Sequence, residues 1–232
     1  MKTPGDFCPI SKAAEVLGER WTILIIRELL YGTTRYSEFQ RGLSLISPSL
    51  LTKRLNQLVD CGLVIRRTAP GQPHAEYFPS VASEELRPFV DGLGKWGMKW
   101  ARGRMIDDEL DVQILMHNFC RRIDAAKLPR KRGVIGFIFP RLPKFSAWWI
   151  VIEPDRPREL CVDHPAKDID IQIRTDVRTM TRIWMGNTTI AAAKSEGCLQ
   201  PSGKPLFVRN LASWLRPSVN ASVRLAPEPL RL

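Results

Sequence analysis

The sequence predicts an α+β protein of two domains, the first mainly helical with one hairpin and the second combining a sheet with helices. Apolar residues recur at helical spacing within residues 21–30 and 49–61. Short β-rich runs bounded by prolines and charged turns occupy residues 134–174. Between these regions, the composition of Gly103–Asp111 turns abruptly acidic. We therefore expect domains over residues 1–104 and 105–218 and an irregular tail over residues 219–232.

Length and composition restrict the class of protein. A chain of 232 residues with 44% hydrophobic and 25% charged residues is typical of a globular protein, and no apolar run is long enough to span a membrane. The first residues lack the apolar segment of a secretory signal, so we expect a cytoplasmic protein that binds no membrane. The five cysteines are scattered and include no C-x-x-C pair, which argues against a disulfide framework and a zinc site.

The net charge of +11 favours a polyanionic partner but does not locate its binding surface. Residues 1–105 contain 15 Lys+Arg and 10 Asp+Glu, and residues 106–232 contain 20 and 14. The excess is spread over both halves, so it supports nucleic-acid binding only weakly.

The N-terminal region predicts two helices. Ser11–Leu17 has an apolar face of alanine, valine and leucine. Trp21–Leu30 is apolar on nearly every side, which indicates a helix buried in a core. Gly32 can adopt the positive φ that ends such a helix.

A pair of helices around a short turn follows. Arg35–Gly42 predicts one short helix. Ser47 and Pro48 are typical of the N-cap and the first position of another helix, which we expect to run to Cys61. The inward face of that helix carries Leu51, Leu55 and Leu58.

The outward face of this second helix carries small polar and basic side chains. A helix-turn-helix needs such side chains near the N-terminus of its second helix, where they reach base edges in the major groove. The residues predicted to contact DNA from this helix are Ser47, Ser49, Thr52, Lys53, Arg54, Asn56 and Gln57. The alternative is an ordinary amphipathic helix with a solvated face.

A predicted hairpin comes directly after this helix. Gly62–Arg67 predicts a strand, Thr68–Pro73 a turn and Ala75–Pro79 a returning strand. A hairpin in this position is the wing of a winged helix. The wing residues expected beside the phosphate backbone are Arg66, Arg67 and His74.

Several motifs in the first hundred residues carry a family resemblance. They are Cys8-Pro9, Gly18–Leu29, Arg35–Phe39, Ile46-Ser47, Leu51–Leu55, Gly62-Leu63, Glu76-Tyr77, Leu86–Val90 and Trp96-Gly97. Together they resemble the HxlR-type winged helix-turn-helix transcriptional regulators over about residues 7–102. The resemblance implies a dimeric regulator that binds double-stranded operator DNA.

Cys8 is a candidate redox sensor on the same resemblance. In some members of the family a cysteine near this position senses oxidants or electrophiles. The alternative is a small side chain buried under the first helix.

Ser83–Arg102 predicts one helix with Ser83 as its N-cap and an apolar stripe from Leu86 to Trp100. The stripe is longer than a small winged domain can cover. In the resembled family, helices outside the motif pair two subunits, which makes the stripe a candidate homodimer surface. The alternative is that the stripe packs against the second domain of the same chain.

The second half predicts a sheet with helices on either side of it in the sequence. A helix is expected over about Asp111–Ala126. The predicted strands are Val134–Phe139, Ala147–Ile152, Glu159–Val162 and Ile169–Arg174. The predicted later helices run from Thr175-Asp176 to Gly186, from Thr189 to Glu196 and from Leu206 to Leu215.

This half also carries a resemblance. Trp184–Gly186, Ala191–Ala193, Gly197–Gly203 and Trp214-Leu215 resemble the sterol-carrier-protein type 2 domain over about residues 112–218. The resemblance implies an antiparallel sheet covered by helices around an apolar tunnel for a hydrophobic small-molecule ligand. The candidate pocket residues are Phe137, Phe139, Trp148, Trp149, Trp184 and Met185. The alternative for each of them is a role in core packing.

Catalytic machinery is not visible. No nucleotide-binding, zinc-protease or nucleophile-elbow motif occurs, and the three histidines lie in separate predicted elements, so we expect neither an enzyme nor a cofactor. Asp163, His164, Asp168 and Asp170 could approach a metal ion. We interpret Asp168 and Asp170 instead as solvated charges on the polar face of a strand edge.

The sequence therefore predicts a cytoplasmic transcriptional regulator. Its N-terminal winged helix is expected to bind operator DNA as a dimer, and its C-terminal domain is expected to sense an apolar small molecule. The alternative from another class is a lipid-binding or carrier protein whose winged helix serves only protein pairing.

Overall fold

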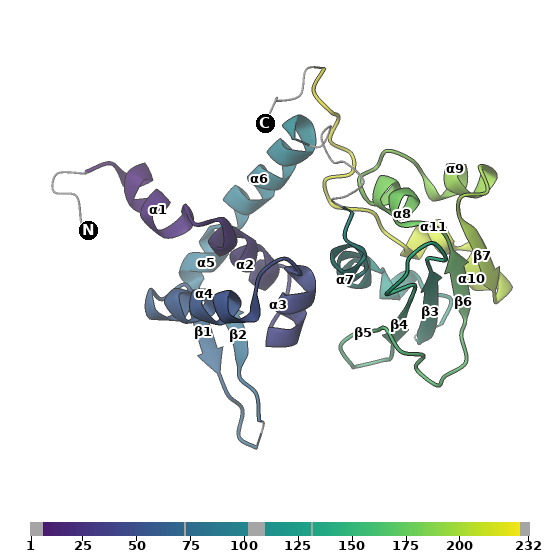
Figure 1. The fold of residues 1–232 in the computed structure, drawn as a ribbon, viewed down its shortest axis with the longest axis horizontal. Helices are drawn as coiled ribbons and strands as arrows, with labels where there is room; N and C mark the ends of the chain where they lie inside the picture. Colours follow the sequence, from purple (N-terminus) through teal and green to yellow (C-terminus); the bar gives the residue numbers. More distant parts are fainter. Residues whose placement is uncertain (1–6, 72, 102–109, 131, 228–232) are drawn as a thin grey trace. The chain divides into compact units, whose positions relative to one another are not determined.

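The computed structural model describes residues 7–71, 73–101, 110–130 and 132–227. The chain divides into two units, Met1–Gly94 and Lys95–Leu232, and each has its own hydrophobic core. The predicted boundary after residue 104 lies outside the described residues. Both units combine helices and strands, which confirms the predicted α+β class (Figure 1).

The first four helices follow the predicted order. They are α1 (Pro9–Leu17), α2 (Arg20–Leu30), α3 (Tyr36–Gly42) and α4 (Pro48–Asp60). Ile25 and Ile26 of α2 are fully buried, and Gly32 has a φ of +94° just after the helix. The prediction of a core helix ended by this glycine is confirmed.

The core of unit 1 decides which side of α4 faces solvent. Leu51 and Leu55 are fully buried, Leu58 is nearly so, and all three belong to one cluster with Ile25 and Phe39. Because a helix has 3.6 residues per turn, the side opposite these leucines is left to solvent. The predicted inward face of α4 is therefore confirmed.

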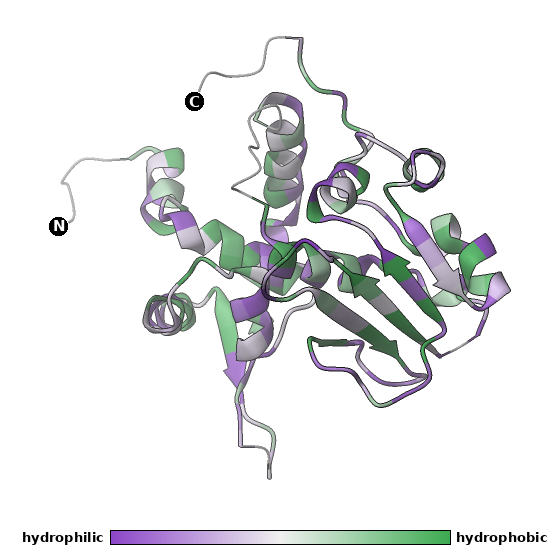
Figure 2. Ribbon diagram, turned by 45° about the vertical axis from the view of Figure 1, so that its right-hand side comes forward, coloured by the Kyte–Doolittle hydropathy of each residue, from purple (hydrophilic) through white to green (hydrophobic). Residues whose placement is uncertain are grey.

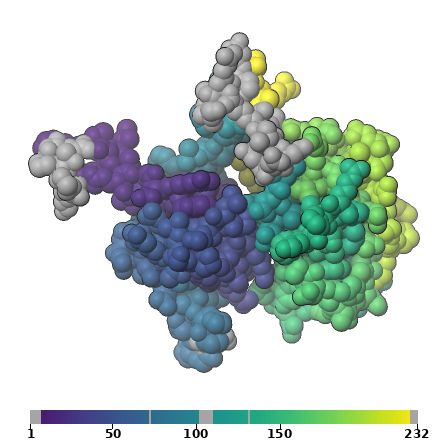
Figure 3. All heavy atoms as spheres, in the orientation of Figure 1, coloured from purple at the N-terminus to yellow at the C-terminus, as the bar shows by residue number. Residues whose placement is uncertain are grey.

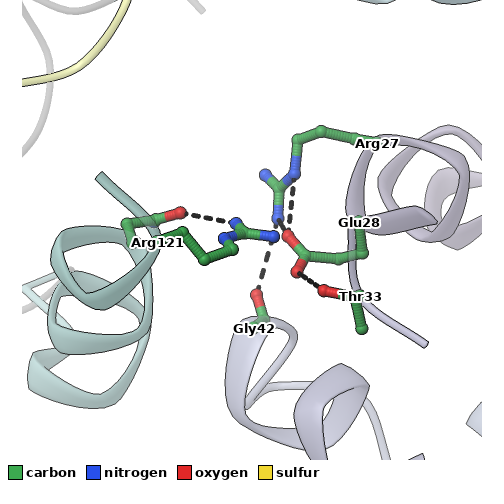
Figure 4. Close-up of polar contacts among 6 residues, drawn as sticks. Arg27, Glu28, Thr33, Gly42 and Arg121 are labelled. Carbon is green, nitrogen blue, oxygen red and sulfur yellow. Dashed lines mark hydrogen bonds and ion pairs between the residues drawn. The ribbon is translucent and has the colours of Figure 1, made fainter. Parts of the chain in front are cut away.

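A buried carboxylate on α2 bonds to the turn after the helix. Glu28 is fully buried, and Arg27 donates to its carboxylate through Nη2 at 2.6 Å and Nε at 3.2 Å (Figure 4). Thr33 Oγ1 donates to the second carboxylate oxygen at 3.1 Å, and Arg27 also reaches the carbonyl oxygen of Gly42 at 3.5 Å. A buried carboxylate needs such partners, so these bonds favour one conformation of the connection between α2 and α3.

The wing is an antiparallel hairpin, as predicted. Strand β1 (Val64–Arg67) pairs with β2 (Glu76–Pro79), with Arg66 opposite Tyr77 and Arg67 opposite Glu76. The hairpin tip projects from the rest of unit 1 in the space-filling view (Figure 3).

The helix predicted to start at Ser83 is two helices. The first, α5 (Val81–Glu85), is capped by Ser80, and α6 runs over Arg87–Trp100. Ser83 is buried inside α5, where its hydroxyl donates to the carbonyl oxygen of Leu63 at 2.7 Å. The prediction of Ser83 as N-cap is therefore wrong. Pro88 explains the break, because it has no N–H to continue α5 but suits the first turn of a new helix.

Unit 2 contains the remaining elements. Its helices after α6 are α7 (Val112–Arg122), the 3-10 turn η3 (Ala125–Lys127), α8 (Val177–Trp184), α9 (Ile190–Ser195), α10 (Pro205–Arg209) and α11 (Leu211–Trp214). Its strands are β3 (Gly133–Ile138), β4 (Ala147–Ile152), β5 (Glu159–Cys161), β6 (Ile171–Arg174) and β7 (Gln200–Gly203).

Three predicted elements of unit 2 differ in detail. The first helix ends at Arg122 because Ile123 leaves helical geometry and pairs with Leu215. The helix predicted over Leu206–Leu215 is interrupted at Asn210. Strand β7 was not predicted, because its sequence Gln-Pro-Ser-Gly lacks an alternating apolar pattern.

The sheet has the order β5-β4-β3-β6-β7. The expectation of an antiparallel sheet is wrong for one pairing, because β3 and β6 are parallel. The connection from β5 to β6 explains this, since residues 162–170 pass the positions of β4 and β3 before the chain enters β6. His164 of this connection lies against the ring of Trp149, with 5.4 Å between the ring centroids.

One face of this sheet makes the core of unit 2 with the helices. Ile135, Ile150, Ile171 and Ile173 are fully buried and cluster with side chains of α7, α8, α10 and α11. The hydropathy colouring shows the apolar character of the central strands (Figure 2).

Asp170 is not the solvated charge that we expected. Its residue surface is 7% exposed, and its carboxylate accepts a hydrogen bond from the backbone N–H of Val134 at 2.9 Å and pairs with Lys204. Asp168 is exposed, as predicted. The interpretation as solvated charge fails at Asp170 because Lys204, next to β7, supplies a distant partner.

No helix among the described residues is long and apolar enough to cross a membrane.

Candidate nucleic-acid interface

The exposed side of α4 presents a row of polar side chains. Ser49, Lys53 and Asn56 are exposed and lie one helical turn apart, opposite the buried leucines. Among the described residues, Lys53 and Asn56 make no side-chain hydrogen bond or ion pair that would hold them to the protein. Both are therefore available to an external partner.

Ser47 has a structural task at the start of α4. Its hydroxyl oxygen accepts a hydrogen bond from the N–H of Leu50 at 3.3 Å, and Pro48 occupies the first helical position. The predicted cap is confirmed. Ser47 therefore positions the face of α4 in addition to lying at its edge.

Arg54 and Gln57 are tied to the protein. Arg54 pairs with Glu19 at 2.5 Å and donates to Gln57 Oε1 at 3.0 Å, and only 18% of its side chain is exposed. The structure thus separates Lys53 and Asn56, which have no such partner among the described residues, from Arg54 and Gln57, which are held in place.

Thr52 is linked to α3. Its hydroxyl donates to the carbonyl oxygen of Pro48 at 3.0 Å and lies 3.1 Å from the hydroxyl of Tyr36. The Tyr36 hydroxyl in turn lies 2.8 Å from the same carbonyl oxygen. No local sequence pattern predicts this role of Tyr36, because it depends on a contact between two helices.

The wing places its basic side chains on an exposed ribbon. Arg66, Arg67 and His74 are all exposed. Arg67 lies over the ring of Phe78, 5.3 Å from its centroid, which orients the guanidinium group.

A hollow of about 960 Å³ separates the wing from the start of α3. Its lining brings Arg66 and His74 together with Arg35, which was not among the predicted DNA-binding residues. Arg35 belongs here because the backbone of Thr34 accepts a hydrogen bond from Tyr77 at 2.9 Å, and because Arg35 pairs with Glu76 at 3.5 Å. The segment before α3 is thus joined to the edge of the wing, and three basic side chains face one hollow.

Comparisons with known proteins agree with this geometry. A model of the HxlR-like helix-turn-helix family matches residues 16–105. The HTH-type transcriptional regulator YvaP of Bacillus subtilis is 33% identical over 104 residues, which are 44% of this chain and 96% of YvaP. The chain belongs to the HxlR-like helix-turn-helix family.

Two further proteins are similar to parts of this chain. The HTH-type transcriptional regulator sll1512 of Synechocystis is 33% identical over 97 residues, which are 41% of this chain and 72% of sll1512. The solved structure of the transcriptional regulator YodB of B. subtilis in its reduced form is 29% identical over 39% of this chain and 91% of that chain, with a TM-score of 0.36.

The HxlR-like chain is accordingly a DNA-binding transcriptional regulator of the helix-turn-helix type. Its Cys8 is exposed at the N-cap of α1. Among the described residues, no group of three or more His, Cys, Asp or Glu side chains could hold a metal ion.

The six candidate pocket residues of unit 2 do not share one surface. Phe137, Phe139 and Trp148 are buried in the core between the sheet and the helices. Trp184 is partly buried and packs edge-on against Phe119, with 5.1 Å between the centroids. Met185 is half-buried just after α8.

Trp149 points to the opposite face of the sheet, since successive side chains of a strand alternate. Its indole lies beside Gly136, and its Nε1 is buried without a hydrogen-bond partner among the described residues. The expectation that Trp148 and Trp149 line one pocket is therefore corrected.

Proposed function

We propose that this regulator binds operator DNA as a homodimer, with α4 in the major groove and the β1–β2 wing on the phosphate backbone. The observation that carries the proposal is the outward row of Ser49, Lys53 and Asn56, fixed by the buried leucines on the other side of α4. A helix of this kind, second in a helix-turn-helix, presents donors and acceptors to base edges.

The wing supplies the part of the interface that does not depend on sequence. Arg66, Arg67 and His74 are exposed on the hairpin, and Arg35 faces the same hollow. Positive side chains beside DNA neutralise phosphates and release counterions, which gives affinity for any duplex. Operator binding also requires the compartment that holds the DNA, which is the reason to propose a cytoplasmic location.

Replacement of Lys53 and of Arg67 should have different effects. Lys53→Ala should weaken binding to the preferred duplex by roughly 1–3 kcal/mol and relax the preference for it, since Lys53 is assigned to a base. Arg67→Ala should weaken preferred and random duplexes by the same factor, since it is assigned to a phosphate. Fluorescence anisotropy with a duplex selected by the wild-type protein and with a scrambled duplex measures both.

Arg156→Ala is the control for loss of one positive charge, because Arg156 is exposed in unit 2. It should bind both duplexes like the wild type. Equal losses for Lys53→Ala on both duplexes would remove Lys53 from base recognition.

Homodimer formation is supported by apolar side chains left in solvent. Phe89, Leu93 and Trp96 of α6 are 68%, 54% and 49% exposed and lie on one side of the helix. Helix α1 buries none of its residues, and its Ile10 is 78% exposed. Apolar faces of this kind on two helices favour pairing with the same faces of a second copy.

Charged residues at Leu93 and Trp96 should prevent the pairing. The double variant Leu93→Glu, Trp96→Glu is expected to sediment as a monomer and to lose operator affinity, because one half-site supplies only part of the binding energy. Replacement of Val162 and Phe145, which are similarly exposed in unit 2, by glutamate is the matched control. A dimer that survives the α6 substitutions would show that this face has another use.

We also propose that unit 2 binds an apolar small molecule and that this ligand changes operator binding. The support is a layer of helices against one face of a five-stranded sheet, with aromatic residues such as Phe137 and Trp148 between them. This arrangement favours a domain of the sterol-carrier-protein type 2 kind, which the sequence resembles. Trp184 and Met185 at the end of α8 are partly accessible at the edge of the helix layer.

The chain after α11 offers a physical connection from this region to α6. The N–H of Ser218 donates to the carbonyl oxygen of Trp184 at 3.0 Å, and the N–H of Ala226 donates to the carbonyl oxygen of Lys99 at 2.8 Å. Ala226 is 4% exposed. The described part of the predicted irregular tail, residues 219–227, has no helix or strand. The bonds at Ser218 and Ala226 hold the segment between them, so movement of Trp184 can reach the last turn of α6.

Two glycines allow a test of this connection. Gly186 and Gly197 have φ values of +74° and +72°, so alanine strains the backbone at either position. A Cβ at Gly186 would lie 2.2 Å from the carbonyl oxygen of Ala221, whereas a Cβ at Gly197 would meet nothing within 4 Å. Only Gly186→Ala should displace the tail.

Gly186→Ala is expected to weaken operator binding by about fivefold or more relative to Gly197→Ala, within the usual range of coupling between sites. The reason is loss of the bond between Ala226 and the end of α6, next to the proposed dimer surface. Sedimentation measures dimerisation, and fluorescence anisotropy measures operator binding. Equal behaviour of the two variants would show that the tail does not connect unit 2 to DNA binding.

A further inference from the structure

Three oxygen atoms meet at the first turn of α4. The hydroxyl of Tyr36 lies 2.8 Å from the carbonyl oxygen of Pro48 and 3.1 Å from the hydroxyl of Thr52. The hydroxyl of Thr52 lies 3.0 Å from the same carbonyl oxygen. Each atom is therefore within hydrogen-bond distance of the other two.

This triangle offers inward acceptors for every proton that its members own. Each hydroxyl has one proton, and the carbonyl of Pro48 has none. In one arrangement Tyr36 donates to Thr52 and Thr52 donates to Pro48. In the second, Thr52 donates to Tyr36 and Tyr36 donates to Pro48. In the third, both hydroxyls donate to Pro48. In all three arrangements both protons stay inside the triangle, and Thr52 keeps at least one lone pair for a partner outside it.

Thr52 is exposed on the same side of α4 as Lys53 and Asn56, so its lone pair faces the surface assigned to bases. A lone pair accepts a hydrogen bond and cannot supply one. In the major groove, adenine N6 and cytosine N4 are amino donors, whereas guanine O6 and thymine O4 are acceptors. The chemistry of this position therefore favours two of the four bases.

We propose that Tyr36 makes Thr52 an acceptor-only reader, which selects a base with an exocyclic amino group, adenine or cytosine, at one position of each half-site. The inference rests on the proposed placement of α4 in the major groove. Tyr36 is a positioning residue, since it acts through Thr52. Its hydroxyl gives the proton of Thr52 a second acceptor inside the triangle, and a keto oxygen brought to the same place would meet oxygen lone pairs on both sides.

Tyr36 could also serve only to hold α3 against α4, and the two roles differ in what they change. A purely structural contact would alter stability and affinity for every duplex alike. A role in selection changes the ratio between amino and keto bases at one position and leaves binding to unrelated DNA unchanged. The ratio is therefore the quantity to measure.

The test is selection of duplexes from a randomised pool by the full-length protein, followed by anisotropy titrations of all four bases at each operator position. The wild type should favour adenine or cytosine over guanine or thymine at one position per half-site by roughly five- to tenfold. In Tyr36→Phe, Thr52 loses one of the two acceptors that hold its proton inside the triangle, so donation to a base outside it becomes easier. The preference should then fall below about threefold, with unchanged affinity for a scrambled duplex.

Two further variants and one control complete the design. Thr52→Val retains the shape but not the hydroxyl and should lose the preference, whereas Thr52→Ser should retain it. Tyr31→Phe removes a hydroxyl that bonds to Asp91 at 3.1 Å, away from α4, and should behave like the wild type. Thr52→Val tests the reader itself if Tyr36→Phe does not fold, because a base profile unchanged by Thr52→Val would remove the position on which Tyr36 is proposed to act.

Different experimental results would overturn the role of Tyr36 and the proposed function. A defined operator with the same base profile for wild type, Tyr36→Phe and Thr52→Val would overturn the role of Tyr36, as would a preference for guanine or thymine at the position that Thr52→Val affects. Enrichment of no duplex by the wild type would overturn operator recognition itself.

Discussion

The packing of three leucines beneath α4 is the constraint on which the DNA-binding surface depends. Leu51, Leu55 and Leu58 fill the core of unit 1, and truncation of a buried leucine to alanine costs about 2–5 kcal/mol. Rotation of α4 by one residue would turn these leucines away from the core and polar residues such as Asn56 toward it. The hydrophobic core therefore selects the polar row that faces outward, and the cap at Ser47 and the contact from Tyr36 fix the first turn of that row.

Much of unit 1 could be predicted because its signals are local. Ser47-Pro48 marks a helix start, Gly32 marks a helix end, and the strands on either side of Thr68–Pro73 mark the wing, all within a few residues of the feature concerned. The same locality explains why the predicted bounds of the first helices and of the two hairpin strands agree with the structure to within a residue or two. Family resemblance led to the same arrangement, and the comparisons confirm the helix-turn-helix family.

The contacts that modify the site are not local, so the sequence could not supply them. Arg54 is held by Glu19, 35 residues away, and Tyr36 reaches Thr52, 16 residues away. Asp170 was misjudged for the same reason, since its partner Lys204 lies 34 residues further on. The parallel pairing of β3 with β6 likewise depends on the path of the connection between β5 and β6, which side-chain alternation does not encode.

The salt dependence of DNA affinity tests the central claim most directly, because it counts the phosphates that the wings neutralise. If Arg66 and Arg67 of both subunits each neutralise one phosphate, the logarithm of the association constant should fall with the logarithm of salt concentration with a slope of about −3.5 or steeper. Affinity that does not change between low and high salt would contradict the proposed wing contacts and would favour a winged helix that serves only protein pairing.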